Sequence, residues 1–139
     1  MGDRCNCTVH VRRDDLERVM PDWEEELGFE YKHETNGVLM LEFAEVNYAN
    51  MENEGLPTNI PCIIENSAGC EYAAGTRVQD PKADPSVCKC NEWCTDGCKG
   101  FVFGIGDNGL PLVTDAWRKF WALHQKVRAH LWAKKEVLS

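Results

Sequence analysis

The sequence lacks any apolar run that approaches the ~20 residues needed to cross a bilayer. It also lacks an apolar stretch behind the charged N-terminus Met1-Gly2-Asp3-Arg4, so the pattern of a secretory signal is missing. These two absences argue against the membrane-spanning and exported classes. We therefore expect a cytoplasmic protein that works away from membranes.

Basic side chains are scarce over residues 14–71, where two of them stand against fifteen acidic ones. Residues 97–139 are the reverse, with seven basic and three acidic side chains. The formal net charge of the chain is -8, which opposes non-specific attraction to nucleic acid. The acidic part either keeps a small protein in solution or meets a basic partner.

The chain has 139 residues, of which 43% are hydrophobic and 27% are charged, as is usual for one folded domain with one core. Neither an internal repeat nor a low-complexity tract divides it. We predict a single domain over residues 1–139, with a cysteine-rich insertion at about residues 81–100.

Cysteine is abundant, because the chain has eight and four of them fall within eleven residues. These four are Cys88, Cys90, Cys94 and Cys98. A reducing compartment favours a metal over disulfides, although disulfides and unbound thiols both stay open. Four thiolates satisfy tetrahedral zinc and leave no open position, so we predict a structural zinc site. Cys62 or Cys70 could replace one of these ligands.

In the first third of the chain, hydrophobic residues recur at every second position over residues 5–13 and then at helical spacing over residues 14–27. One face of the alternating stretch carries Cys5, Cys7, Val9 and Val11. This predicts a strand over residues 5–13 in which the two cysteines are small buried hydrophobes. A helix is predicted over residues 14–27, with Asp14 and Glu17 as a capping box. Pro21 should kink this helix or split it in two.

Two extended runs, residues 29–34 and 38–46, flank Asn36-Gly37 and predict a β-hairpin. A three-residue loop with a bulge would place the apolar side chains of both strands on one face. The predicted pairs are Phe29 with Phe43, Tyr31 with Leu41, and His33 with Leu39. A two-residue loop, which would set Glu34 opposite Leu39, is the less favoured alternative.

The rest of the chain predicts short strands and one long helix. Residues 61–64 and 71–78 indicate strands, and residues 101–113 indicate a hairpin around Asp107-Asn108-Gly109. Gly104, Gly106 and Gly109 match the glycine pattern of a dinucleotide-binding motif. We reject this interpretation because an extended run with a proline, and not a helix, follows the last glycine. A helix capped by Thr114 has an apolar stripe of Trp117, Phe120, Trp121, His124, Val127 and Leu131. Trp132 lies outside this stripe and is expected at the surface.

This order of elements predicts an α+β protein, with an antiparallel sheet that has two helices on one face and a cysteine-rich, zinc-bound loop. A ferredoxin-like arrangement is one candidate for the sheet.

Three segments of the sequence resemble segments found in one group of proteins. They are Met1-Gly2-Asp3-Arg4, Glu45-Val46-Asn47-Tyr48 and Ala68-Gly69-Cys70-Glu71-Tyr72-Ala73-Ala74-Gly75. In them the chain resembles uncharacterised small proteins of bacteriophages and plasmids. The resemblance implies a mobile-element origin and brings no activity, cofactor or site residue with it.

Acidic side chains crowd the first predicted helix and form the candidate partner-binding site. They are Asp14, Asp15, Glu17, Asp22, Glu24, Glu25 and Glu26. Carboxylates spaced along one surface can imitate phosphates and steer a protein to a basic groove. The pattern predicts a non-enzymatic inhibitor of a basic, nucleic-acid-binding host protein, such as a component of a defence system.

Two other classes stay open. The basic residues near the C-terminus are Arg118, Lys119, Lys126, Arg128, Lys134 and Lys135. With Trp132 they could bind phosphates and stack a base, as in a zinc-stabilised nucleic-acid-binding module. A cysteine enzyme would use Cys70 as its nucleophile and would need a histidine close by in the fold to activate it.

Overall fold

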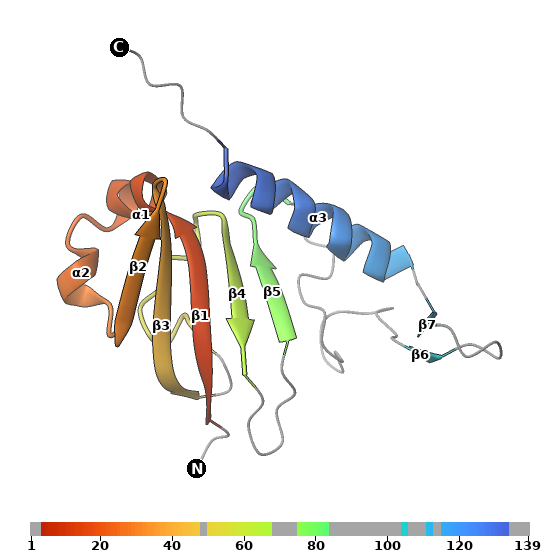
Figure 1. Cartoon of the computed structure of the whole chain (residues 1–139), viewed down its shortest axis with the longest axis horizontal. Coiled ribbons are helices and arrows are strands. Elements are labelled where there is room, and N and C mark those ends of the chain that lie inside the picture. The colour runs from red at the N-terminus through yellow and green to blue at the C-terminus, as the bar shows by residue number, and fades with distance from the viewer. Residues whose placement is uncertain are drawn as a thin grey trace.

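The computed structural model of the chain describes residues 4–47, 50–67, 75–83, 104–105, 111–112 and 115–133. Five of the described strands form an antiparallel sheet in the order β2-β3-β1-β4-β5 (Figure 1). These strands are β1 (Arg4–Arg12), β2 (Tyr31–Thr35), β3 (Val38–Asn47), β4 (Cys62–Asn66) and β5 (Gly75–Gln79). The helices are α1 (Arg13–Val19), α2 (Trp23–Glu26) and α3 (Asp115–Leu131). The predicted α+β class with an antiparallel sheet is confirmed.

The central strand β1 pairs with β3 on one side and β4 on the other. Its side chains alternate as the sequence predicted, and Cys5, Cys7, Val9 and Val11 are all buried. A strand that pairs on both edges and buries one whole face organises the core. The interpretation of Cys5 and Cys7 as small buried hydrophobes is confirmed.

The predicted helix over residues 14–27 is two short helices, α1 and α2, with Pro21 between them. A proline has no amide hydrogen for the bond back to the preceding turn, and this splits the apolar stripe of the helix. The predicted capping box is wrong, because α1 has Arg12 at its N-cap and no side-chain cap. Glu17 instead accepts a hydrogen bond from Arg13.

The hairpin of β2 and β3 forms at Asn36-Gly37, but its register differs from the predicted one. Thr35 pairs with Val38 and Glu34 pairs with Leu39, so the loop has two residues. Asn36 and Gly37 have φ of 53° and 80°, the left-handed values of the turn that matches strand twist. The prediction failed because it matched apolar faces, whereas all five residues of the edge strand β2 are exposed.

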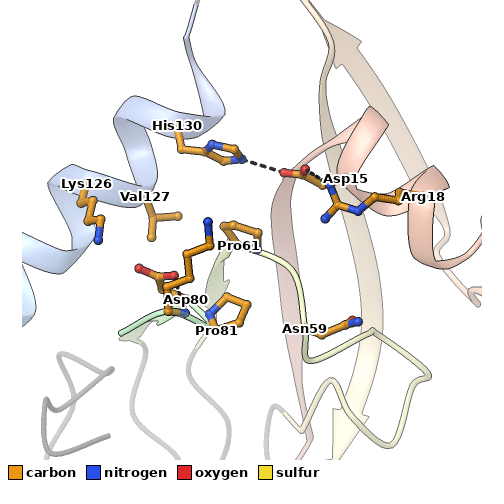
Figure 2. A pocket seen from close by; sticks show the side chains of 10 residues that line it. Asp15, Arg18, Asn59, Pro61, Asp80, Pro81, Lys126, Val127 and His130 are labelled. Carbon is orange, nitrogen blue, oxygen red and sulfur yellow. Dashed lines mark hydrogen bonds and ion pairs between the residues drawn. The ribbon is translucent and has the colours of Figure 1, made fainter. Parts of the chain in front are cut away.

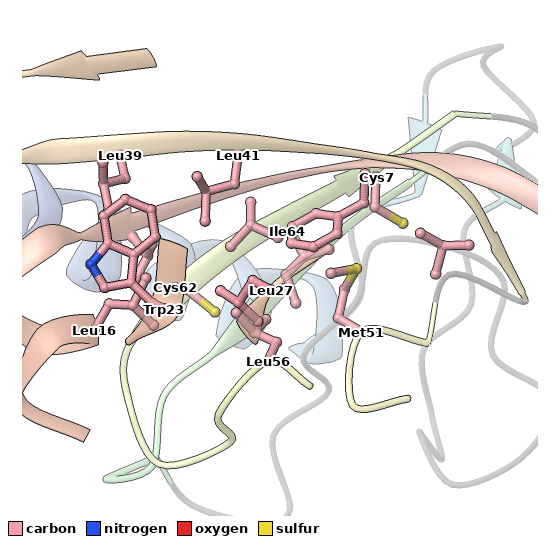
Figure 3. Close-up of a cluster of buried hydrophobic side chains, with 14 of the residues drawn as sticks. Cys7, Leu16, Trp23, Leu27, Leu39, Leu41, Met51, Leu56, Cys62 and Ile64 are labelled. Carbon is pink, nitrogen blue, oxygen red and sulfur yellow. The ribbon is translucent and has the colours of Figure 1, made fainter. Parts of the chain in front are cut away.

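The helices lie on opposite faces of the sheet, so the expectation of two helices on one face is wrong. On the face that includes Val9 and Ile64, α1, α2 and the 50–61 loop cover the main core (Figure 3). Ile63 and Val78 point to the other face, where they pack against α3. Neighbouring residues of one strand alternate between the two faces, which gives each helix layer its own cluster.

The buried stripe of α3 consists of Phe120, Leu123, Val127 and Leu131. The predicted stripe included Trp121, which is 49% exposed, and omitted Leu123. Residues 120 and 121 are 100° apart on a helix, so the choice of the stripe decides which aromatic ring is buried. Trp132 is 48% exposed, as expected. The side chain of Trp117 lies outside the described residues.

The strands predicted at residues 61–64 and 71–78 and the hairpin predicted at residues 101–113 agree with the structure where it describes them. β4 pairs antiparallel with β5 from Cys62–Gln79 to Asn66–Gly75. Strands β6 (Gly104–Ile105) and β7 (Pro111–Leu112) also pair antiparallel, while the turn at residues 107–109 lies outside the described residues. No helix in the described part of the chain is long and apolar enough to cross a membrane.

Candidate functional site

The predicted zinc ligands Cys88, Cys90, Cys94 and Cys98 lie outside the described residues, as does Cys70. Among the residues that are described, no group of three or more His, Cys, Asp or Glu side chains could hold a metal ion. The zinc site at residues 88–98 therefore stays a prediction from the sequence.

The three described cysteines, Cys5, Cys7 and Cys62, are free and buried. Burial raises the pKa of Cys62 to about 12. Burial, together with the neighbouring Cys5, raises the pKa of Cys7 to about 12 as well. A thiol attacks or binds metal as its thiolate, so these two groups are suited to packing and not to nucleophilic catalysis at neutral pH.

Four of the seven predicted partner-binding carboxylates already have cationic partners. Asp14 contacts Arg12 at 3.1 Å. Glu17 contacts Arg13 at 2.6 Å, and this hydrogen bond, with a smaller one from Trp23, lowers the pKa of the Glu17 carboxyl. Of the other two carboxylates, Glu24 contacts Lys32, and Asp15 contacts both His130 and Arg18. Only Asp15 of these four is buried.

The other three, Asp22, Glu25 and Glu26, are exposed on α2 and at its N-cap. None of them has an ion pair within the part of the chain that the structure describes. Glu30, directly before β2, donates its amide hydrogen to the carbonyl oxygen of Glu42 in β3. The side chains of Glu30 and Glu42 are also exposed, and neither has an ion pair with a described residue. The sequence showed that these carboxylates exist but could not tell which ones are neutralised.

A cavity of about 320 Å³ with several charged residues in its lining lies where α1, the end of β5 and α3 meet. Figure 2 shows its walls, to which the loop before β4 also contributes. Its charged and titratable lining residues are Asp15, Arg18, Asp80, Lys82, Lys126 and His130. Sequence reasoning did not assemble this site, because no sequence pattern connects Asp80 and Lys82 with the first helix and because His130 lies 115 residues from Asp15.

The contact between Asp15 and His130 joins α1 to α3 on one side of this cavity. His130 Nε2 lies 2.7 Å from Asp15 Oδ2, and Arg18 Nη1 lies 3.4 Å from Asp15 Oδ1. The side chain of Asp15 is 10% exposed and that of His130 is 46% exposed. The prediction of Asp15 as part of a partner-binding surface is therefore not supported by its position, since most of this carboxylate faces its own protein.

The exposed side of α3 carries aromatic and basic groups. The rings of Trp121 and His124 are stacked, with centroids 5.3 Å apart and planes 1° apart. Burial, followed by the charge of Arg128, lowers the pKa of His124. Arg128 and Trp132 border the same shallow hollow beside His10 and Glu65. Lys134 and Lys135 of the predicted basic set lie outside the described residues.

Searches against protein-family models, curated proteins and solved structures found no match to this chain. Its function must therefore be argued from its own residues.

Proposed function

We propose that this chain is an acidic, non-enzymatic protein of a mobile element that binds and inhibits a basic, nucleic-acid-binding host protein. The observation that carries the proposal is the group of exposed carboxylates on α2 and at its N-cap, Asp22, Glu25 and Glu26, which we call the α2 acidic surface. Its carboxylates are exposed and have no ion pair among the described residues.

The pairing of the neighbouring carboxylates makes this surface distinct. Arg13 holds both Glu17 and Glu34, at 2.6 and 2.7 Å, and Lys32 holds Glu24. Arg13 and Lys32 thus neutralise carboxylates that neighbour the α2 acidic surface, and they do not neutralise the carboxylates of the surface itself. Like charges left together repel one another and destabilise a protein, and a cationic partner would remove that cost. Exposed carboxylates also steer association with a basic groove, where they occupy the place of phosphates.

A charge-reversal experiment tests the proposal. The variant Asp22→Lys/Glu25→Lys/Glu26→Lys should lose most of its affinity for a partner captured from cells of the source organism. The matched control, Glu45→Lys/Glu52→Lys/Glu65→Lys, makes the same change in net charge at exposed positions elsewhere. The affinity of the parent should also fall as salt rises to physiological strength, because exposed charges are screened.

Two outcomes would contradict the proposal. Equal loss of binding in both triple variants would mean that net charge matters and the α2 acidic surface does not. Binding that does not respond to salt would exclude phosphate imitation and leave the carboxylates as a solubility feature.

A second candidate, direct binding of nucleic acid by α3, is favoured by one observation. Trp132 is 48% exposed and borders the same hollow as Arg128, so one hollow is lined by a tryptophan and an arginine. Such a pair can stack a base and bind a phosphate. Fluorescence titration of Trp132→Ala and the parent with a single-stranded oligonucleotide separates the two functions, because inhibition of a basic protein requires no such binding.

The strand order adds a finer structural proposal. The order β2-β3-β1-β4, with a helical connection from β1 to β2, is that expected of a ferredoxin-like sheet. The chain departs from that plan between β3 and β4, where described residues 50–61 form turns and no helix. We propose a ferredoxin-like sheet in which a loop replaces the second helix and β5 extends the edge.

A further inference from the structure

The cavity between α1 and α3 has its charges in two layers. Asp15 and Asp80, at 7% and 5% exposure, lie at its buried end. Arg18, Lys82 and Lys126 are exposed at its rim. A ligand that enters from solvent would therefore meet cations first and carboxylates beyond them.

Asp80 is the group at the buried end that lacks a counter-ion. Its Oδ1 accepts a hydrogen bond from the Lys82 amide at 3.0 Å, and its carboxylate makes no ion pair with any described residue. In Figure 2 this carboxylate points from the end of β5 toward Lys126 and Val127 of α3, into the cavity. A buried carboxylate without a cation costs free energy, which a positively charged ligand group would recover.

Asp15 differs from Asp80, because His130 and Arg18 already hold its two oxygens. These contacts hold Asp15 in place in one wall of the cavity. Asp80 is then the buried carboxylate of the cavity that has no cationic partner among the described residues. Lys126 projects from the opposite wall and has no ion pair in the described part of the chain. The cavity thus offers a buried negative group, Asp80, and an exposed positive group, Lys126, on facing elements. Lys82, two residues after Asp80, is a second exposed cation that has no ion pair in the described part of the chain.

We propose that this cavity binds a small zwitterion of the amino-acid class, with its ammonium group at Asp80 and its carboxylate at Lys126. A ligand with only a negative charge would be repelled by the carboxylate of Asp80. A ligand with only a positive charge would be repelled by the three exposed cations at the rim. Only a ligand with both charges satisfies both layers. The volume of about 320 Å³ is roughly ten times the ~30 Å³ that one water occupies, which leaves room for such a molecule.

Ligand-observed NMR with the whole 139-residue chain tests this inference. The probes are the standard L-amino acids, one at a time at millimolar concentration, followed by the N-acetyl and the amide derivative of each one that binds. At least one free amino acid should bind, and each blocked derivative should bind about tenfold more weakly or worse, because each lacks one charge. If no amino acid binds, or if a blocked derivative binds as well as its parent, the inference is overturned.

Two variants locate the binding. Asp80→Asn should weaken binding of the amino acid about tenfold or more, and Lys126→Ala should weaken it in the same direction while the affinity for the amide derivative does not fall. Glu26→Gln, on the α2 acidic surface, is the matched control and should bind as the parent does. Thermal unfolding of each variant without ligand shows that the fold survives. Unaltered affinity in both cavity variants would place the ligand elsewhere and refute the site, without any bearing on the α2 acidic surface.

Discussion

The guanidinium of Arg12, at the end of β1, donates a hydrogen bond from Nη1 to the carbonyl oxygen of Leu131 at 3.0 Å. Leu131 is the last residue of α3, and the carbonyl of Ala133 accepts from the same nitrogen at 3.2 Å. The last carbonyls of a helix have no partner within it, and a cation there also complements the helix dipole. Arg12 thereby fixes the C-terminal end of α3 to the central strand of the sheet.

Removal of this contact should destabilise the whole fold. Arg12 is 4% exposed, so Arg12→Ala would leave the carbonyl groups of Leu131 and Ala133 without this donor and would remove the ion pair between Arg12 and Asp14. We expect a loss of about 3 kcal/mol in the free energy of unfolding, measured by urea denaturation. Arg18→Ala is the control, because Arg18 makes a more exposed ion pair and should cost less than about 1 kcal/mol. Equal costs would mean that Arg12 does not hold α3.

Gly37 should resist substitution, whereas Gly28 should not. Gly37 has a φ of 80°, and a Cβ there would lie 3.4 Å from Arg12 Nη2. Gly37→Ala should cost about 1–2 kcal/mol, because the left-handed region is strained for residues with a Cβ. Gly28 has no such φ and no atom within 4 Å of an added Cβ, so Gly28→Ala should change stability by less than about 1 kcal/mol. The urea midpoints of both variants give the comparison, and similar midpoints would contradict it.

The cysteine-rich segment should hold one zinc ion per chain, bound by Cys88, Cys90, Cys94 and Cys98. Because a metal that binds the native state adds to its stability, the melting temperature should fall in chelator. Elemental analysis of protein purified under reducing conditions gives the stoichiometry. Cys94→Ser should lower the metal content and the melting temperature, while Thr95→Ser beside it should change neither. If the purified protein contained no stoichiometric metal, the prediction of a zinc site would be wrong.

The features that the sequence predicted correctly are those that neighbouring residues determine. The alternation of Cys7, Val9 and Val11 encodes a strand, and Pro21 splits the helix by its own covalent structure. Asn36-Gly37 favours a hairpin because these two residues adopt left-handed φ at little cost. Each signal lies within a few residues of its effect.

The features that were wrong or missed depend on contacts between distant residues. Asp15 looks like any surface carboxylate in the sequence, and its burial follows from His130, which α3 brings to within 2.7 Å. The hairpin register depended on whether β2 would be covered, and β2 is an edge strand of the sheet with all five residues exposed. The choice between Trp121 and Leu123 for the core was likewise decided by the face of α3 that meets Ile63 and Val78.

The buried thiol of Cys62 should make the stability of the fold decrease in alkaline solution. Its pKa rises from the ordinary value of 9.0 to about 12 in the folded chain because of burial. Above pH 9.0 the unfolded chain releases this proton while the folded chain keeps it, so the free energy of unfolding falls as pH rises from 9.0 toward about 12. One such group contributes about 1.4 kcal/mol for each pH unit within that window.

Urea denaturation of the parent and of Cys62→Ala at about pH 8 and about pH 10 measures this effect. The variant should be less stable than the parent at the lower pH, because a buried group that packs in the core has been removed. It should nevertheless lose about 1 kcal/mol less than the parent between the two pH values, since the titrating thiol is absent. Tyrosines, lysines and the other thiols titrate in the same range, but they contribute alike to both proteins and cancel in the difference. The same pH dependence in parent and variant would show that Cys62 is not held as a buried neutral thiol.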